Sequence, residues 1–531
     1  MAQTLNSRVN TGPFVGLSLL ALLLALPLAA KALLPETPLT LGLVNGAVAL
    51  IVFVQGLGVI RVIWDLEKQF QGLFPLASCY FTVQHAAFGF GGVLVSLSDR
   101  GYMYMNDHGT FSYAEFMLPL MLAHFLAMNA GLAGVWVATR RARRQGRMGA
   151  LEFQRLRQRN WSWDELRPVC IVSLALHGIF TLVFLMPELS MPFVVRYPAQ
   201  AMEPIVAVTF VFWGLAWQTC TRKSLFAAYY ACYLTLEVIR GQRGNFLIVS
   251  VLFALGYLLA GNRFSIRPML KWAPLIALLL VCIVKAENVR SEFTRGTPDS
   301  VDDAMARLGS LADSSDDFGY SFLDAQGILM NGTFRIAARL FELSAMDVVA
   351  RTPSEVPYRG WDDSDWTDLI SELLPVKLYT DAAVLKDDHA GVLFLHDYGW
   401  SAVDPSQGNA MPATLVADSF RRYSWAGVVV WFVFWGWALA SASGTMRSSG
   451  DRFVMIFAAT MLLIVDFLYS SDIVSLAATL PRRLMLAALY AITVRGLAAV
   501  ISRRGQSPDT GAIPMREQVA RLGPPAHARR F

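Results

Sequence analysis

Arginines occur in close pairs at three places in the chain, where their guanidinium groups could bind an anionic ligand. The pairs are Arg240 with Arg243, Arg335 with Arg339, and Arg421 with Arg422. A guanidinium group can hold a phosphate through two parallel hydrogen bonds, and it stays charged at physiological pH. The pairs therefore indicate a candidate binding site for a phosphate-containing ligand.

The first pair has the clearest local context. Gly241 and Gly244 follow the two arginines in Arg240-Gly-Gln-Arg243-Gly, and glycine lets a backbone approach a ligand closely. A helix that begins here would also offer unpaired backbone N–H groups to a phosphate. The alternative is that arginines near a membrane surface extend toward water and do nothing more.

The second pair, Arg335 and Arg339, has the i, i+4 spacing that puts both side chains on one face of a helix. Glu342 follows three residues later. This pattern is typical of a solvated helical face with a local ion pair. The functional alternative is a second contact to the same anion.

The third pair lies directly before an apolar run, together with Asp418. A membrane helix that begins here would bring Asp418, Arg421 and Arg422 to the membrane surface. An acid in the first turn of a helix is an ordinary capping preference. Paired arginines at an outer helix end are unusual, because Lys and Arg favour the inner side of a membrane.

Metal ligands are sparse in the sequence. Asp387, Asp388 and His389 could hold a divalent ion, but His389 and His396 are seven residues apart and no His-Glu-x-x-His occurs. The five cysteines lie in or beside apolar runs, so neither a disulfide framework nor a thiolate metal site is expected. We expect neither a metal ion nor a cofactor.

The elements that carry these residues are expected to be membrane helices. The chain is 55% hydrophobic and 16% charged, whereas a soluble protein carries about 25% charged residues. Runs of about 20 apolar residues match the thickness of the bilayer hydrocarbon. About twelve such runs occur: 13–34, 39–63, 73–97, 114–138, 168–188, 203–220, 224–240, 244–261, 270–286, 425–442, 453–470 and 482–500. The sequence therefore predicts an all-α polytopic membrane protein.

Charge indicates which connections lie on which side. Nine arginines between positions 140 and 167 mark a cytoplasmic connection, and the other short basic loops agree with it. Residues 288–424 hold 22 of the 40 acidic residues and 11 of the 45 basic residues, which favours the outside, in a bacterium the periplasm. We expect N-terminal membrane helices (1–286), a periplasmic loop (287–424), C-terminal membrane helices (425–502) and a disordered tail (503–531), with both termini cytoplasmic.

The order of these elements resembles a bacterial family. About twelve spans, Arg240-Gly-Gln-Arg243-Gly opening a mid-chain span, and one long outer loop are similar to the Wzy-type O-antigen and exopolysaccharide repeat-unit polymerases, relatives of the O-antigen ligases. The loop closes with Pro412-Ala-Thr414, Asp418 and Tyr423-Ser-Trp425-Ala-Gly427. Family members often have Phe-Gly where this chain has Tyr423-Ser424, and Glu or His where it has Asp418.

The resemblance implies a GT-C-like, metal-independent glycosyltransferase of the bacterial inner membrane. It would transfer a growing glycan from an undecaprenyl-diphosphate donor to a sugar hydroxyl of a lipid-linked acceptor. Arginines would neutralise the departing diphosphate, and a carboxylate or His would accept the hydroxyl proton. The implied diphosphate-binding or substrate-binding residues are Arg240, Arg243, Arg335, Arg339, Arg421 and Arg422. The implied base is Asp418, with His396 and Glu342 as the other candidates.

Several functions stay open at this point. An O-antigen ligase shares the fold and differs in its acceptor, whereas a flippase or transporter of lipid-linked oligosaccharides would need polar residues lining the bundle at mid-membrane. Few charges lie within the apolar runs, which favours the enzyme. The expected partners are the lipid-linked substrates and membrane lipid, together with a flippase and a chain-length regulator. No basic cluster suits nucleic acid.

Overall fold

The computed structural model describes the segments 12–35, 38–70, 76–97, 103–106, 109–144, 163–185, 202, 205–239, 243–260, 306, 348–363, 365–366, 369–370, 398, 414–446 and 473–505. These segments are mainly helical and contain one antiparallel hairpin. Its strands are β1 (Met103–Asn106) and β2 (Gly109–Ser112), and Met103 pairs with Ser112.

Five helices in this part of the chain are long and apolar enough to cross a membrane. The helices are α3 (Pro38–Phe70), α6 (Tyr113–Arg144), α8 (Trp163–Leu185), α19 (Leu415–Met446) and α21 (Ile473–Gly505). A helix of 32 or 33 residues, such as α3, α6 or α21, is about 50 Å long at 1.5 Å per residue, which exceeds the roughly 30 Å of bilayer hydrocarbon. The chain is therefore a helical membrane protein.

Shorter elements complete the described part of the chain. They are α1 (Gly12–Leu23), α2 (Ala25–Leu33), α4 (Leu76–His85), the π-helix η1 (Ala86–Phe90), α5 (Gly91–Leu97), α10 (Thr209–Ala216), α11 (Lys223–Ile239) and α12 (Arg243–Leu259). Ten of the twelve predicted apolar runs coincide with described helices. The other two, 270–286 and 453–470, lie outside the described residues.

Two helices extend beyond the runs that predict them. Helix α19 begins at Leu415, ten residues before the predicted span at 425, so the end of the predicted periplasmic loop is helical. Helix α21 begins at Ile473 and continues to Gly505, past the predicted start of the tail at 503. The first of these differences matters for the site, because the additional turns of α19 carry Asp418 and both arginines of the third pair.

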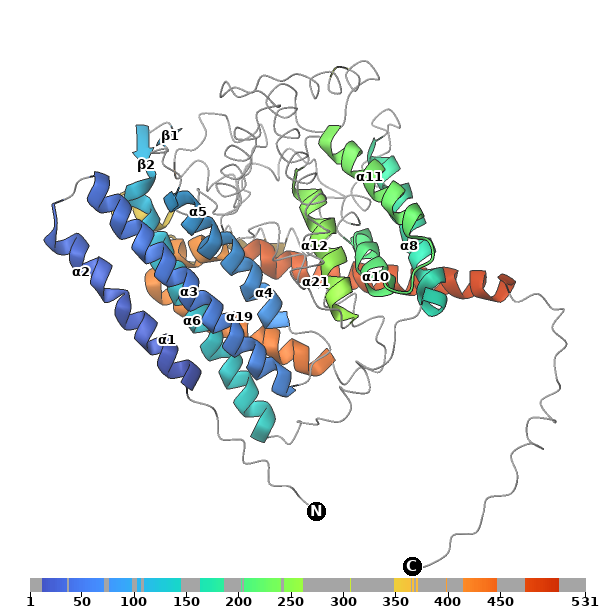
Figure 1. Ribbon diagram of the computed structural model, residues 1–531, viewed down its shortest axis with the longest axis horizontal. Coiled ribbons are helices and arrows are strands. Elements are labelled where there is room, and N and C mark those ends of the chain that lie inside the picture. The colour runs from blue at the N-terminus through green and yellow to red at the C-terminus, as the bar shows by residue number, and fades with distance from the viewer. Residues whose placement is uncertain are drawn as a thin grey trace, which may run out of the picture.

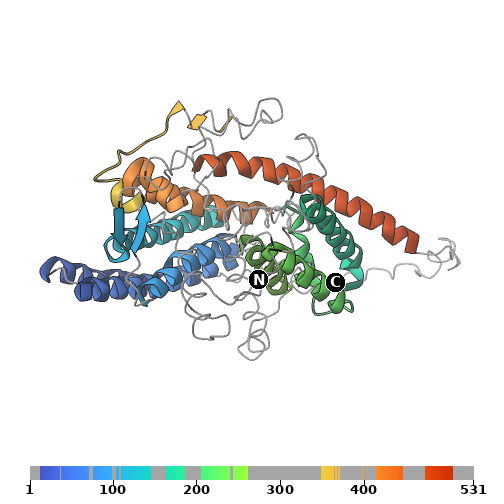
Figure 2. The ribbon, with the colours of Figure 1, turned by 90° about the horizontal axis from the view of Figure 1, so that it is seen from above.

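The described helices form two groups (Figure 1). Helices α1 to α6 lie together with α19, whereas α8, α10, α11 and α12 form the second group. Helix α21 contacts α19 near its beginning and then crosses to α8, so it connects the two groups; Figure 2 shows its length from above.

Glycines allow a close backbone contact between α6 and α19 in the first group. A Cβ atom added to Gly134 would lie 2.1 Å from the carbonyl oxygen of Val433, and one added to Gly436 would lie 2.3 Å from that of Gly131. The two helix backbones therefore touch. Small residues at a helix crossing are a common basis of helix association in membranes, and this crossing fixes the direction of α19 below the site.

Candidate functional site

The site begins where α19 begins, because Thr414 caps this helix. Its Oγ1 accepts a hydrogen bond from the backbone N–H of Ala417 at 3.1 Å, which is the bond expected of a Thr N-cap. The cap places Asp418, Arg421 and Arg422 in the first two turns of the helix. Their spacing then puts all three side chains on adjacent positions of one face.

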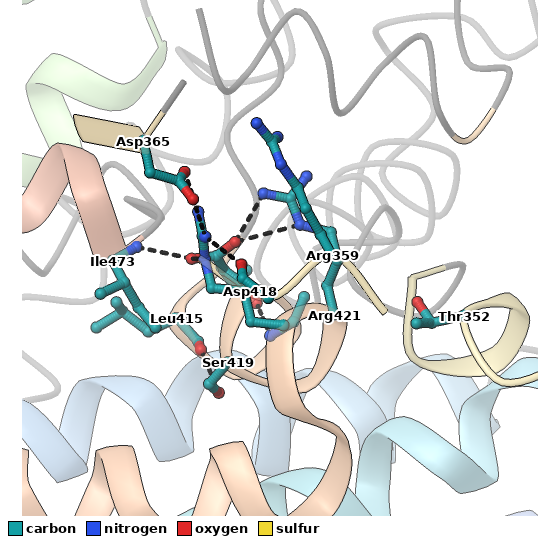
Figure 3. Close-up of polar contacts among 12 residues, drawn as sticks. Thr352, Arg359, Asp365, Leu415, Asp418, Ser419, Arg421 and Ile473 are labelled. Atoms are coloured by element: carbon teal, nitrogen blue, oxygen red, sulfur yellow. Dashed lines mark hydrogen bonds and ion pairs between the residues drawn. The ribbon is translucent and has the colours of Figure 1, made fainter. Parts of the chain in front are cut away.

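Asp418 is fully buried and accepts four hydrogen bonds (Figure 3). Its Oδ1 accepts from Arg421 Nε at 3.2 Å and Nη2 at 2.7 Å. Its Oδ2 accepts from Arg422 Nε at 3.0 Å and from the backbone N–H of Ile473 at 2.9 Å. Ile473 is the first residue of α21, so this carboxylate also caps that helix and ties it to α19.

Arg422 links the same carboxylate to a second one from a distant segment. Its Nη1 and Nη2 donate to the two oxygens of Asp365 at 2.6 and 2.8 Å, a bidentate ion pair in which both side chains are fully buried. Nη1 also donates to the carbonyl oxygen of Gly360 at 2.8 Å. We call Asp365, Asp418, Arg421 and Arg422 the ion-pair quartet; its formal charges sum to zero.

The segment that carries Asp365, residues 358–370, is held to α19 by its backbone as well, and we call it the strap. The N–H groups of Arg359 and Gly360 donate to the carbonyl oxygens of Arg421 and Arg422 at 3.1 and 3.3 Å. Gly360 has φ of +69°, a conformation that favours glycine. The indole ring of Trp361 lies 5.3 Å from the guanidinium carbon of Arg422, which adds a cation–π contact.

These strap bonds are possible because α19 is interrupted directly after the arginines. Tyr423 and Ser424 are non-helical, and Ser424 has φ of 59° and ψ of −155°, a region occupied almost only by glycine. Gly427 makes room for the kink, since a Cβ there would lie 2.2 Å from the Ser419 carbonyl oxygen. The kink exposes carbonyl groups of the first two turns, and the strap occupies two of them.

The predicted site residues are thus described to different extents. Asp418, Arg421 and Arg422 come together in one buried cluster. Arg243 is the first residue of α12, so its backbone lies at a helix N-terminus as predicted. The structure describes the backbone of this residue and not its side chain. The residues outside the described part of the chain are Arg240, Arg335, Arg339, Glu342 and His396.

The geometry bears on what the three described residues can do. A carboxylate has about four acceptor positions, and Asp418 already receives four donors, so in this conformation it stabilises charge and helix contacts. Arg422 uses at least four of its five N–H groups on protein oxygens. The arrangement therefore supports positioning roles for this cluster. The proton-accepting role of Asp418 stays a prediction.

Sequence reasoning missed Asp365 as the partner of Arg422, although the acidic Asp362–Asp368 stretch is visible in the sequence. It also did not pair Tyr398 with Thr352 and Arg351: Tyr398 is fully buried, its hydroxyl lies 2.6 Å from Thr352 Oγ1, and its carbonyl oxygen accepts from Arg351. No periodic pattern connects such distant residues, so only a three-dimensional structure can pair them.

A second polar cluster lies in the first helix group, on α4 and α6. His85 and His124 stack with ring centroids 5.4 Å apart, and His85 Nδ1 lies 3.1 Å from His124 Nε2. His85 Nε2 is 3.0 Å from the Phe53 carbonyl oxygen, which can only accept, so Nε2 carries the hydrogen; in a neutral ring His85 Nδ1 then accepts from His124. His124 Nδ1 is then a buried acceptor with no hydrogen-bond partner among the described residues.

Within the described segments, no three His, Cys, Asp or Glu side chains gather as a metal site would require. No protein-family model, curated protein or solved structure matches the chain.

Proposed function

We propose that this chain is a glycosyltransferase that polymerises undecaprenyl-diphosphate-linked oligosaccharide repeat units into O-antigen or exopolysaccharide at the periplasmic face of the inner membrane. In this proposal the chain has about twelve spans in a GT-C-like arrangement, and both termini lie in the cytoplasm. The kink of α19 is the observation that carries the proposal. Ser424 adopts a glycine-like conformation at the position where the resembling polymerases often have glycine.

The proposed reaction is a displacement at the sugar carbon attached to the diphosphate. A hydroxyl oxygen of the acceptor repeat forms the new glycosidic bond, the bond to the diphosphate oxygen breaks, and the hydroxyl proton passes to a base. Undecaprenyl diphosphate leaves with the bonding electrons. Positively charged donors that are already in place stabilise this departing charge without a metal ion.

The proposed roles follow from the arginine pairs. Arg243, at the N-terminus of α12, and Arg240 contact the diphosphate, and Arg335 and Arg339 support them. Arg422 contributes by holding the strap against α19, since its N–H groups reach Asp365 and the Gly360 carbonyl oxygen, and Arg421 contributes by balancing the charge of Asp418. Asp418 remains the proposed base that accepts the hydroxyl proton. The alternatives are His396 and Glu342, which lie outside the described residues.

The test uses a strain that lacks the chain and is complemented with wild type, Arg243→Ala, Arg243→Lys or the control Arg61→Ala. Arg61 is an exposed arginine paired only locally, with Asp65 at 3.2 Å. Gel analysis of surface and lipid-linked glycans then reports the reaction, and immunoblotting reports the protein level. We expect long chains from wild type and Arg61→Ala, and single lipid-linked repeats from Arg243→Ala.

Arg243→Lys separates charge from geometry. A Lys keeps the charge but lacks the planar fork, so we expect poor rescue if the contact to phosphate is bidentate. Near-normal polymer from Arg243→Ala would remove the central assignment. Complete chains that stay on the lipid carrier in the deletion strain would indicate the related ligase instead.

A flippase or transporter of lipid-linked oligosaccharide is the second candidate, and the His85–His124 pair favours it. An ionisable pair buried among membrane helices is a functional hypothesis by default, and the π-helix η1, a form that is frequent at functional sites, begins directly after His85. This candidate predicts that repeats accumulate on the cytoplasmic side of the deletion strain. It also predicts that His124→Leu reproduces this accumulation, whereas the polymerase proposal predicts normal chains.

A further inference from the structure

We infer that the strap is a membrane-interfacial element whose exposed aromatic and apolar side chains contact lipid, with the bilayer itself as the partner. This inference concerns how the strap is held and does not depend on the proposed polymerase activity. It rests on the exposed residues of the strap, on their continuity with α19, and on the ion pair that joins the two.

Exposed large apolar side chains gather on the strap and at the kink that it touches. Trp366 and Ile370 are 54% and 52% exposed, and Tyr423, in the kink, is 52% exposed. Tyr358 and Trp425 are exposed as well, and the Tyr358 hydroxyl donates to Ser424 Oγ at 3.1 Å. Trp and Tyr are enriched where membrane meets water, because their rings are apolar and their tips are polar.

The surface at the kink continues into the apolar part of α19. Trp425, Val429 and Val430 are all exposed, Val430 by 68%; Trp425 and Val429 share one helical face through their i, i+4 spacing, and Val430 widens the exposed surface beside Val429. On an apolar membrane helix this face contacts lipid. Tyr423 and Trp425 therefore lie at the end of a lipid-facing surface, which identifies lipid rather than a sugar or a protein as the material beside them.

The exposed side chains of the strap change from polar to apolar along its described positions. The described positions 363, 365, 366, 369 and 370 are helical, and Asp363, Trp366 and Ile370 are exposed whereas Asp365 is fully buried. Residues spaced by three, four and seven share one face. At helical spacing, these three exposed positions run from an acid to a large apolar residue over about 10 Å. We expect Asp363 to stay in water and Ile370 to reach the acyl boundary.

Lipid contact and the ion-pair quartet would both hold the same short segment of the strap in place. Asp365 and Trp366 are neighbours in sequence. Trp366 is exposed and would contact lipid, whereas Asp365 points into the protein and pairs with Arg422. Trp361 connects the two sides, because its ring lies over Arg422 and packs edge-on against Trp366 with centroids 5.4 Å apart. A bilayer that holds Trp366 therefore also holds Asp365 in its pair.

Site-directed spin labelling of the full chain in lipid nanodiscs tests the inference. Each label replaces one residue in a chain whose five native cysteines are changed to serine: Asp363→Cys, Trp366→Cys, Ile370→Cys, Val430→Cys as the lipid reference and Lys223→Cys as the water reference. Collisions with oxygen report lipid exposure, and collisions with a water-soluble nickel chelate report water exposure.

We expect labels at 366 and 370 to match Val430→Cys, with oxygen collisions exceeding nickel collisions, and the label at 363 to match Lys223→Cys. Water-like values at both 366 and 370 would overturn the inference. Protection of both sites from both reagents would overturn it too, because it would mean that protein covers them. None of these outcomes depends on polymer formation, so failure here is separable from failure of the proposed function.

Discussion

Asp365 and Arg422 form a bidentate ion pair across 57 residues of sequence, with nitrogen–oxygen distances of 2.6 and 2.8 Å and both side chains buried. The pair joins the strap to the first turns of a membrane helix, α19. Through Arg422 it continues to Asp418 and so to the N-terminus of α21. Three segments that are far apart in sequence therefore depend on one charge network.

This relationship predicts strong energetic coupling. Asp365→Asn leaves the buried quartet with an uncompensated positive charge, and removing one partner of a buried ion pair typically costs about 3–5 kcal/mol. Thermal unfolding of Asp365→Asn, Arg422→Gln and the double variant in nanodiscs measures the coupling, and the double variant should lose less than the sum of the singles. The control is the Arg61–Asp65 ion pair, which is exposed and has i, i+4 spacing. The coupling energy of such a pair is about 0.3–0.5 kcal/mol. Strict additivity at Asp365 and Arg422 would contradict the prediction.

Asp418→Asn separates a structural role from a catalytic one. Because Asp418 is the counter-charge of two arginines and the cap of α21, we expect this change to lower the unfolding temperature and the polymer yield together. A residue that acted only as a base would leave a stable, inactive protein. Wild-type stability with lost activity would therefore restore Asp418 as the leading base candidate, and wild-type values of both would exclude both roles.

Ser424→Gly should stabilise the protein. A non-glycine residue in this backbone region costs on the order of 1–3 kcal/mol, which exceeds the roughly 0.5–1 kcal/mol that glycine loses through its greater freedom when unfolded. Ser424→Ala is the matched control, since it also removes the hydroxyl that bonds Tyr358 but keeps the strain. We expect the glycine variant to be more stable than the alanine variant by about 1 kcal/mol in denaturant unfolding. Equal stability would mean that the kink carries no strain.

The glycines between α6 and α19 should tolerate no side chain. Gly134→Ala and Gly436→Ala would each bring a Cβ within 2.3 Å of a backbone oxygen on the other helix, so the helices must separate. We expect both variants to lose folded protein in size-exclusion chromatography. Gly42→Ala and Gly46→Ala are the controls, because nothing lies within 4 Å of their added methyl groups and Ala favours a helix over Gly by about 1 kcal/mol.

Hydropathy predicts the helices well and their beginnings less well. The run 39–63 corresponds to α3 and 114–138 to α6, because apolar length is what a bilayer requires. The apolar run that predicts α19 begins only at 425, because charged residues such as Arg421 and Arg422 interrupt the hydropathy before it. The structure shows why helix continues there: Thr414 caps it, and the carboxylates of Asp418 and Asp365 neutralise Arg421 and Arg422 in the protein interior.

The quartet itself could be predicted only in part. Asp418, Arg421 and Arg422 are three and four residues apart, so their contact follows from helical spacing once the helix is known. Asp365 could not be assigned, since it is one of several acids in a stretch with no clear period, and its partner is 57 residues away. The strain at Ser424 was also hidden, because nothing local indicates a glycine-like conformation at a serine.

The most direct test of the central claim is polymerisation by the purified chain. The protein, in nanodiscs with EDTA present, receives undecaprenyl-diphosphate-linked repeat units, and the products are resolved by gel electrophoresis and mass spectrometry. The account predicts a ladder of multiples of the repeat with release of undecaprenyl diphosphate, and no ladder from Arg243→Ala. Unchanged single repeats with folded wild-type protein, or a ladder that forms only when a divalent metal ion is added, would contradict it.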